Sequence, residues 1–131
     1  MAYFFCKFIT PRKDFLKTMS ADEAKLLKAH GEYLQELLER GRVVAHGPVV
    51  EPQGGFGLSL FDVEDENELS ELTAQDPMIL AGVGARYDTF PMIQLRYWRN
   101  LGDRIGLHLE QVWTRSLKFP TLRPPPPGLW L

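Results

Sequence analysis

The chain has 131 residues, enough for one domain with a modest core and too few for two independent ones. Its 44% apolar and 24% charged residues are typical of a soluble globular protein, and no apolar run reaches the roughly 18 residues that a transmembrane helix needs. Residues 1–97 carry 10 Lys and Arg against 15 Asp and Glu, whereas residues 98–131 carry 5 against 2. The acidic body argues against nucleic-acid binding, which needs a concentrated basic surface, and no membrane association is expected.

The N-terminal segment predicts a first strand, and the cysteine content of the chain indicates a reducing compartment. Residues 2–9 are rich in aromatic and β-branched side chains, as strands are. They lack the basic and apolar regions of a secretory signal peptide, so a cytoplasmic location is expected. The single cysteine, Cys6, cannot form an internal disulfide. Within such a strand it is interpreted as a small packed hydrophobic residue rather than a nucleophile.

A polar loop is expected from Thr10 to Met19, followed by a strongly marked amphipathic helix. Ser20 and Glu23 have the spacing of a capping box, in which each side chain bonds a free backbone amide at the helix start. Apolar-face positions then recur at helical spacing as far as the stop signal at Gly41, and they are Leu27, His30, Leu34, Leu37 and Leu38. One polar ring therefore lies on a face otherwise made of leucines.

Two strands joined by a hairpin are expected next, at residues 43–49 and 56–61, with the turn at Gln53-Gly54-Gly55. The glycines here are interpreted as hairpin residues and not as a phosphate-binding loop. Such a loop leads from a strand into a helix and ends in Gly-Lys-Ser/Thr, and neither feature is present.

A second helix is expected to begin at Asp65, because the carboxylates there favour the positive end of a helix dipole. It is expected to end at Asp76, since Pro77 disfavours helical geometry in the residue before it. A fourth strand is predicted over residues 87–97, where Pro91 indicates an edge position or a bulge.

The predicted order is β-α-β-β-α-β, the split-βαβ or ferredoxin-like arrangement of an α+β protein. It places both helices on one face of a four-stranded antiparallel sheet. The opposite face, with its aromatic-rich strands, is left bare. Exposed apolar area of this kind usually marks a partner surface, and a homodimer packed through the sheets is expected.

Residues 98–131 are predicted to form a C-terminal extension of the domain at 1–97, with a composition of its own. All three tryptophans and five of the ten prolines lie there. Apolar spacing predicts a helix at about 100–117, followed by a stiff Pro-rich tail, Arg123–Gly128. The tail is interpreted as a surface arm or a disordered end, with a ligand for an SH3-type domain as the alternative.

His30 and Asp76 are the candidate catalytic pair. An unpaired polar ring among leucines is costly, so His30 needs a hydrogen-bond partner or access to a pocket. Imidazole titrates near neutrality, and a carboxylate on its far nitrogen would fix the tautomer and stabilise the cation. The structural alternatives are a core histidine bonded to a backbone carbonyl and an aspartate that caps a helix break. Pairing and capping are compatible, because a carboxylate has about four lone-pair sites.

Three further residues are candidates for substrate binding. Tyr33 is one helical turn from His30, and its hydroxyl can bind a substrate oxygen, with packing as the alternative. His46, at a predicted strand end beside Gly47-Pro48, can line the same cleft. Arg12, in the loop after the first strand, can hold an anionic group by bidentate hydrogen bonds, against the alternative of a solvated arginine.

No cofactor or metal site is predicted. The three histidines and the single cysteine lack the HxxxH, HExxH and CxxC spacings that gather metal ligands. A ligand set of His30, His46 and Asp76 remains geometrically possible. No serine or cysteine nucleophile with an adjacent base is indicated.

Over residues 3–97 the chain resembles the YciI-like, or YCII-related, family. The resemblance implies a dimeric ferredoxin-like α/β barrel fold, similar to that of muconolactone isomerase, with an active site built from His30 and Asp76. It also implies small-molecule chemistry, since a related member is thought to dehydrochlorinate a chlorinated hydroquinone. The matching segments, in chain order, are Ala29-His30-Gly31-Glu32-Tyr33-Leu34, Gly41-Arg42-Val43-Val44, Gly47-Pro48-Val49, Gly54 and Gly55 through Gly57-Leu58, Asp76-Pro77 and Pro91-Met92.

The chain departs from the family pattern in two places. His46 directly precedes Gly47-Pro48, where the family signature has no histidine. The long extension after Tyr97 can cover the site or an oligomer surface.

Three functions are consistent with these features. The first is a small-molecule enzyme, in which His30 is the general acid or base and Asp76 orients it, for isomerisation, dehydration or elimination on a small carbonyl or aromatic compound. The second is a module that binds a small ligand without chemistry. The third is a dimeric interaction protein whose C-terminal extension recruits a partner.

Overall fold

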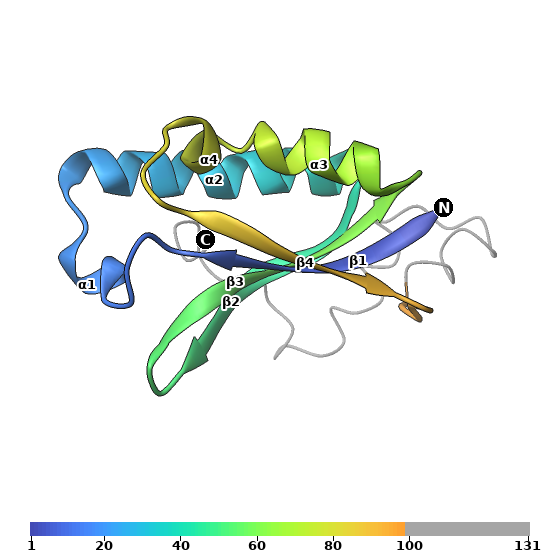
Figure 1. The fold of residues 1–131 in the computed structure, drawn as a ribbon, viewed down its shortest axis with the longest axis horizontal. Helices are drawn as coiled ribbons and strands as arrows, with labels where there is room; N and C mark the ends of the chain where they lie inside the picture. Colours follow the sequence, from blue (N-terminus) through green and yellow to red (C-terminus); the bar gives the residue numbers. More distant parts are fainter. Residues whose placement is uncertain (99–131) are drawn as a thin grey trace, which may run out of the picture. The chain divides into compact units, whose positions relative to one another are not determined.

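The computed structural model describes residues 1–98 (Figure 1), and the helix and Pro-rich tail expected at about 100–117 and 123–128 lie outside the described residues. The strands are β1 (Ala2–Ile9), β2 (Val43–Glu51), β3 (Gly54–Val63) and β4 (Arg86–Met92). The helices are α1 (Phe15–Thr18), α2 (Ala21–Glu39), α3 (Glu66–Ala74) and α4 (Pro77–Leu80).

The strands β1 to β4 form one antiparallel sheet in the order β2-β3-β1-β4. Helices α2, α3 and α4 lie on one face of this sheet (Figure 1). This is the split-βαβ arrangement, so the α+β, ferredoxin-like fold class predicted from the sequence is confirmed. β4, which carries Pro91, is an edge strand, as expected for a residue that cannot donate to the ladder.

Alternation along β1 gives the sheet a covered face and an open face. Phe4, Cys6 and Phe8 are buried beneath the helices, whereas the residues between them are partly exposed. The register aligns Phe8 with Gly57 of β3 and with Tyr87 of β4. A Cβ atom at Gly57 would lie only 3.2 Å from Cβ of Phe8. The glycine therefore lets the phenylalanine lie close to the sheet.

Helix α2 begins at the capping box that the sequence predicts. The Ser20 hydroxyl accepts the backbone N–H of Glu23 at 3.1 Å, and the Glu23 carboxylate accepts the backbone N–H of Ser20 at 2.9 Å. The buried side of the helix packs on the sheet, as its apolar periodicity predicts. Its buried residues are Leu27, His30, Gly31, Leu34 and Leu37.

The structure differs from the sequence prediction in three places. Residues 15–18 form the single turn α1 inside the predicted loop, because the buried ring of Phe15 anchors that segment to the core. Another single turn, α4, follows Asp76, since proline fits well at the first helical position, where its missing N–H is not needed. β4 ends at Met92 rather than at residue 97, because its pairing with β1 stops there.

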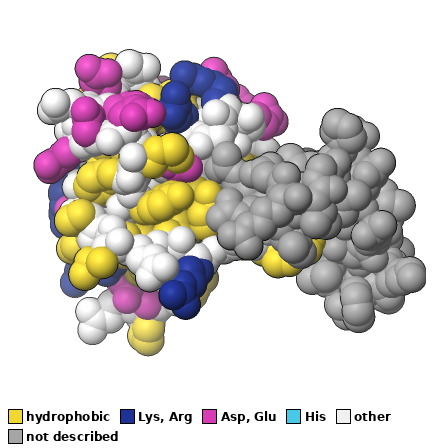
Figure 2. Space-filling view, turned by 90° about the vertical axis from the view of Figure 1, so that its right-hand side faces the viewer, with side chains coloured by type: hydrophobic (Ala, Val, Ile, Leu, Met, Phe, Trp, Pro, Cys, Tyr) yellow, Lys and Arg dark blue, Asp and Glu magenta, His cyan; other side chains and the backbone are white. Residues whose placement is uncertain are grey.

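The two faces of this layered structure differ in chemistry. Figure 2 views the molecule from the right-hand side of Figure 1 and shows acidic side chains gathered toward the helical side, above hydrophobic ones. The acidic run from Glu64 to Glu71 is exposed at most positions, as expected of a solvated helix face. Within residues 1–98, no helix is both long and apolar enough to cross a membrane.

The open face of the sheet carries an apolar cluster together with the charged side chains of Lys7, Arg86 and Asp88. The rings of Phe5 and Phe90 lie with their centroids 5.9 Å apart on it, and Phe90 keeps 47% of its surface exposed. The register places further apolar side chains on the same face, and they are Tyr3, Leu58 and Leu60.

Candidate active site

His30 and Asp76, which are 46 residues apart in the sequence, meet inside the protein. Nδ1 of His30 lies 2.5 Å from Oδ2 of Asp76, and neither side chain has any exposed surface. An ionised carboxylate can only accept hydrogen bonds, so Nδ1 carries the hydrogen and donates it. The structure therefore brings together the two residues that the sequence singles out.

The short helix α4 directs the Asp76 carboxylate. Asp76 is the N-cap of α4, and its Oδ1 accepts the backbone N–H of Met78 at 2.9 Å. Pro77 occupies the first helical position, where its fixed φ suits the start of a helix. Met78 is fully buried in one cluster with Phe8 and Leu27, which holds α4 against α2. Asp76 thus caps a helix through one carboxylate oxygen and binds the histidine through the other.

Tyr87 of β4 is a third member of this network, and the sequence analysis did not identify it. Its hydroxyl donates to Oδ2 of Asp76 at 2.5 Å. Burial, and then the negative charge of Asp76, raise the pKa of Tyr87, so the phenol stays protonated and remains a donor. The signal that could have revealed Tyr87 is its register, since it pairs with the inward-facing Phe8.

The second ring nitrogen of His30 is the one that Asp76 does not bind. With hydrogen on Nδ1, Nε2 is the nitrogen that carries the lone pair whenever the ring is neutral. Nε2 is buried and has no hydrogen-bond partner among residues 1–98. Buried polar atoms are rarely left unpaired, and the exceptions include catalytic groups. The Phe8 ring stacks on the imidazole, with the centroids 4.0 Å apart and the planes inclined by 26°.

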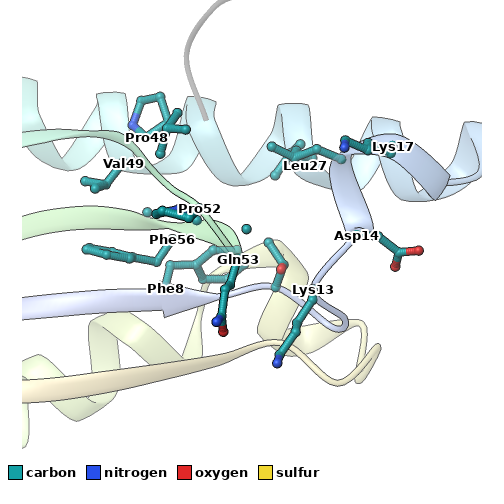
Figure 3. Close-up of a pocket in the computed structure, with 16 residues that line it drawn as sticks. Phe8, Lys13, Asp14, Lys17, Leu27, Pro48, Val49, Pro52, Gln53 and Phe56 are labelled. Atoms are coloured by element: carbon teal, nitrogen blue, oxygen red, sulfur yellow. The ribbon is translucent and has the colours of Figure 1, made fainter.

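A cavity of about 360 Å³ lies beside Phe8 (Figure 3). It is bounded by the segment around α1, the start of α2 and the hairpin between β2 and β3, and its lining includes Phe8, Leu27, Pro48 and Gly57. Neither His30 nor Asp76 is among the lining residues. Phe8 both stacks on the imidazole and lines the cavity.

Three more side chains with reactive groups lie on the covered face. They form the row of the sheet that lies two residues before Phe8 along β1. The register aligns Cys6, Ser59 and His46 across β1, β3 and β2. The buried Ser59 hydroxyl has no hydrogen-bond partner in the described part of the chain. Burial raises the pKa of Cys6 to about 12, so the thiol is not a nucleophile near neutrality. Burial, and then the neighbouring His30, lower the pKa of His46 and favour its neutral form.

His46 lies within β2 and not at a strand end as predicted, because the strand continues through Gly47-Pro48. Its Nε2 is 3.2 Å from Oε1 of Gln35 on α2. Among the described residues, no group of three or more His, Cys, Asp or Glu side chains is placed to hold a metal ion. His30, His46 and Asp76 therefore do not form such a group.

Tyr33 and Arg12, both predicted as substrate ligands, form hydrogen bonds within the protein. The Tyr33 hydroxyl donates to the backbone oxygen of Leu72 at 2.7 Å and so joins α2 to α3. Arg12 donates to both carboxylate oxygens of Glu23, at 2.8 and 2.9 Å, and also to Thr18. This pairing lowers the pKa of Glu23 to about 2. Neither Tyr33 nor Arg12 lines the cavity, and their substrate-binding roles stay predictions.

Comparison with known proteins places the chain in a family. The family model of the YCII-related domain matches residues 3–93. The chain belongs to the YCII-related domain family. This confirms the resemblance that the sequence motifs indicate. No curated protein matches the chain.

One solved structure similar to this YCII-related protein is 5-chloro-2-hydroxyhydroquinone dehydrochlorinase (TftG) from Burkholderia phenoliruptrix, in complex with 2,5-dihydroxybenzoquinone. The two chains are 16% identical and superpose with a TM-score of 0.50. The match covers 74% of this chain and 97% of the dehydrochlorinase. At this level of identity, the similarity establishes a shared fold.

We predict that Tyr87→Phe lowers the free energy of unfolding of this YCII-related protein by roughly 1.5–3 kcal/mol, because a hydrogen bond to a charged acceptor is lost. Tyr33→Phe is the matched control, since it removes a hydroxyl that donates to a neutral backbone oxygen, and its expected cost is roughly 0.5–1.5 kcal/mol. Urea unfolding of both variants measures the difference. Equal losses in the two variants would contradict a charged acceptor at Asp76.

Proposed function

We propose that this protein is a small-molecule enzyme in which His30 is the general acid and base. The observation that carries the proposal is the hydrogen bond between Nδ1 and Asp76, which leaves Nε2 as the ring nitrogen without a partner in the described structure. Asp76 is a positioning residue, because it fixes the tautomer and stabilises the imidazolium that forms when Nε2 takes a proton. Tyr87 and the backbone N–H of Met78 hold the carboxylate in place.

The chemistry that suits this arrangement is proton abstraction beside a carbonyl group. Nε2 takes the proton, and the electron pair of the broken C–H bond enters the carbonyl to form an enolate. Isomerisation follows if Nε2–H returns the proton to a different carbon. Elimination follows if the enolate expels a leaving group with its electron pair. The dehydrochlorinase named above acts on a chlorinated aromatic compound, which supports a cyclic or aromatic substrate for this chain.

The substrate is proposed to bind in the cavity beside Phe8. His30 is completely buried and Phe8 stacks on its ring, so the proposal requires a side-chain movement that opens a path from the cavity to Nε2.

One observation favours the second candidate function, which is binding without chemistry. The dyad does not line the cavity, so the His30–Asp76–Tyr87 network also has the properties of a structural core element. A ligand would then occupy the cavity and leave unchanged. The two functions differ in whether a bound compound exchanges protons with solvent.

We predict that the wild-type protein catalyses deuterium incorporation beside the carbonyl group of at least one member of a panel of cyclic ketones, lactones and hydroxylated quinones in D₂O. We further predict that His30→Asn lowers this rate by roughly 10²–10⁴, the usual contribution of a positioned acid or base. Asparagine keeps an N–H close to the position of Nδ1 and lacks a basic atom at the position of Nε2. Mass spectrometry measures the incorporation.

Ser59→Ala is the control, because it changes another buried side chain of the covered face outside the dyad. Its exchange rate should stay within a few-fold of the wild type. Circular dichroism checks that each variant is folded. An unchanged rate in His30→Asn would remove His30 from catalysis, and binding of a compound without exchange would favour the binding module.

We also propose that the protein is a homodimer packed through the open faces of two sheets. Support comes from the apolar side chains on that face, including Phe5 and the half-exposed Phe90, because monomers rarely expose a large contiguous apolar patch. Sedimentation equilibrium of the full chain tests this proposal. A mass of twice 15.0 kDa is expected, and a monomer mass at micromolar concentration would contradict it.

A further inference from the structure

We propose that the natural ligand of the cavity is an amphipathic anion, with an apolar body inside the cavity and one carboxylate, phenolate or enolate group at its mouth beside Lys13 and Lys17. This inference rests on the proposed function, since it names the substrate class of the same site. It follows from the distribution of charged and apolar side chains around the cavity.

The body of the cavity is apolar. Its lining includes Phe8, Leu16, Leu27, Pro48 and Val50, which offer aliphatic and aromatic carbon and no charge. A volume of about 360 Å³ is within the usual range for a small-molecule site. A compound that fills such a space gains binding energy from the apolar surface that it removes from water.

The cavity is also lined by more positive than negative side chains. Lys13 and Lys17 line it, and neither has an ion-pair partner in the part of the chain that the structure describes. Asp14 is the single acidic residue of the lining. Its carboxylate lies 3.9 Å from Nε of Arg12, and Figure 3 shows it directed away from Phe8. The charged side chains of the lining are therefore two ammonium groups and one carboxylate, which give it a net positive charge.

The segment that carries these lysines is fixed by its surroundings. Arg12, which precedes the two lysines in the chain, binds Thr18 and Glu23, which follow them. On the hairpin side, a Cβ atom at Gly54 would lie 3.2 Å from the backbone oxygen of Lys13, and the φ of Gly54 is +137°. A glycine at this position lets the hairpin backbone approach the lysine segment. The cavity mouth is thus preorganised, which lowers the ordering cost of binding.

This arrangement discriminates between ligands by charge. A neutral apolar compound fills the cavity and leaves both lysines solvated. An anion of the same shape adds one or two partly exposed ion pairs, which are individually modest. We expect a carboxylate to bind roughly three- to tenfold more tightly than its neutral amide. The preference should shrink as salt screens the charges.

The experiment titrates the ¹⁵N-labelled full chain with three matched probe pairs. These are naphthalene-2-carboxylate, 4-phenylbutanoate and octanoate, each compared with its primary amide, and shifts of the Gly54–Gly57 amides locate the binding. Lys13→Met/Lys17→Met removes the two charges at nearly constant side-chain length. Lys25→Met/Lys28→Met is the matched control, because both residues are exposed on α2 and do not line the cavity.

We expect the wild type and the control variant to prefer the anion of at least one pair by roughly three- to tenfold. The Lys13/Lys17 variant should lose that preference and bind the amide as before. Equal binding of anion and amide by the wild type would overturn the inference and leave the proposed function standing. A preference that survives in the Lys13/Lys17 variant would also overturn it. Failure of all six probes to bind at the cavity would contradict both proposals.

Discussion

The structure depends on the buried Asp76 carboxylate, which caps α4 and joins it to α2, 46 residues earlier at His30, and to β4. It accepts hydrogen bonds from His30 of α2, from the backbone of Met78 in α4 and from Tyr87 of β4. A carboxylate taken out of water is stable only when its lone pairs are satisfied, and here three donors satisfy them. The same group that closes α4 onto α2 therefore also determines the orientation of the histidine.

The proposed chemistry follows from this arrangement. Because Asp76 holds hydrogen on Nδ1, the basic lone pair of His30 is on Nε2, in an apolar environment next to Phe8. The same phenylalanine is part of the wall of a cavity whose mouth carries Lys13 and Lys17. Phe8 thus contacts the proposed base and also lines the cavity. An enzyme of this design would shield its base from water until a side-chain movement opens a path to it.

The features that the sequence predicts are those with local signals. The capping box at Ser20, the apolar periodicity of α2 and the Asp76-Pro77 helix break are each visible within a few residues, and together they identify both members of the dyad. Tyr87 has no such signal, because β4 mixes polar and apolar residues on both faces and only its pairing with β1 makes Tyr87 point inward. The contact between Phe8 and His30 likewise depends on packing between elements. Helix α1 is too short to show a periodic pattern in the sequence.

The account makes one claim that can be measured without knowing the substrate, namely the tautomer of His30. Long-range ¹H–¹⁵N correlation spectra of the full chain near neutral pH distinguish protonated from unprotonated ring nitrogens, and the loss of signals in His30→Asn assigns them. We predict a protonated Nδ1 and an unprotonated Nε2 for His30. A proton on Nε2 at that pH would mean that no free base faces the cavity wall and would contradict the account.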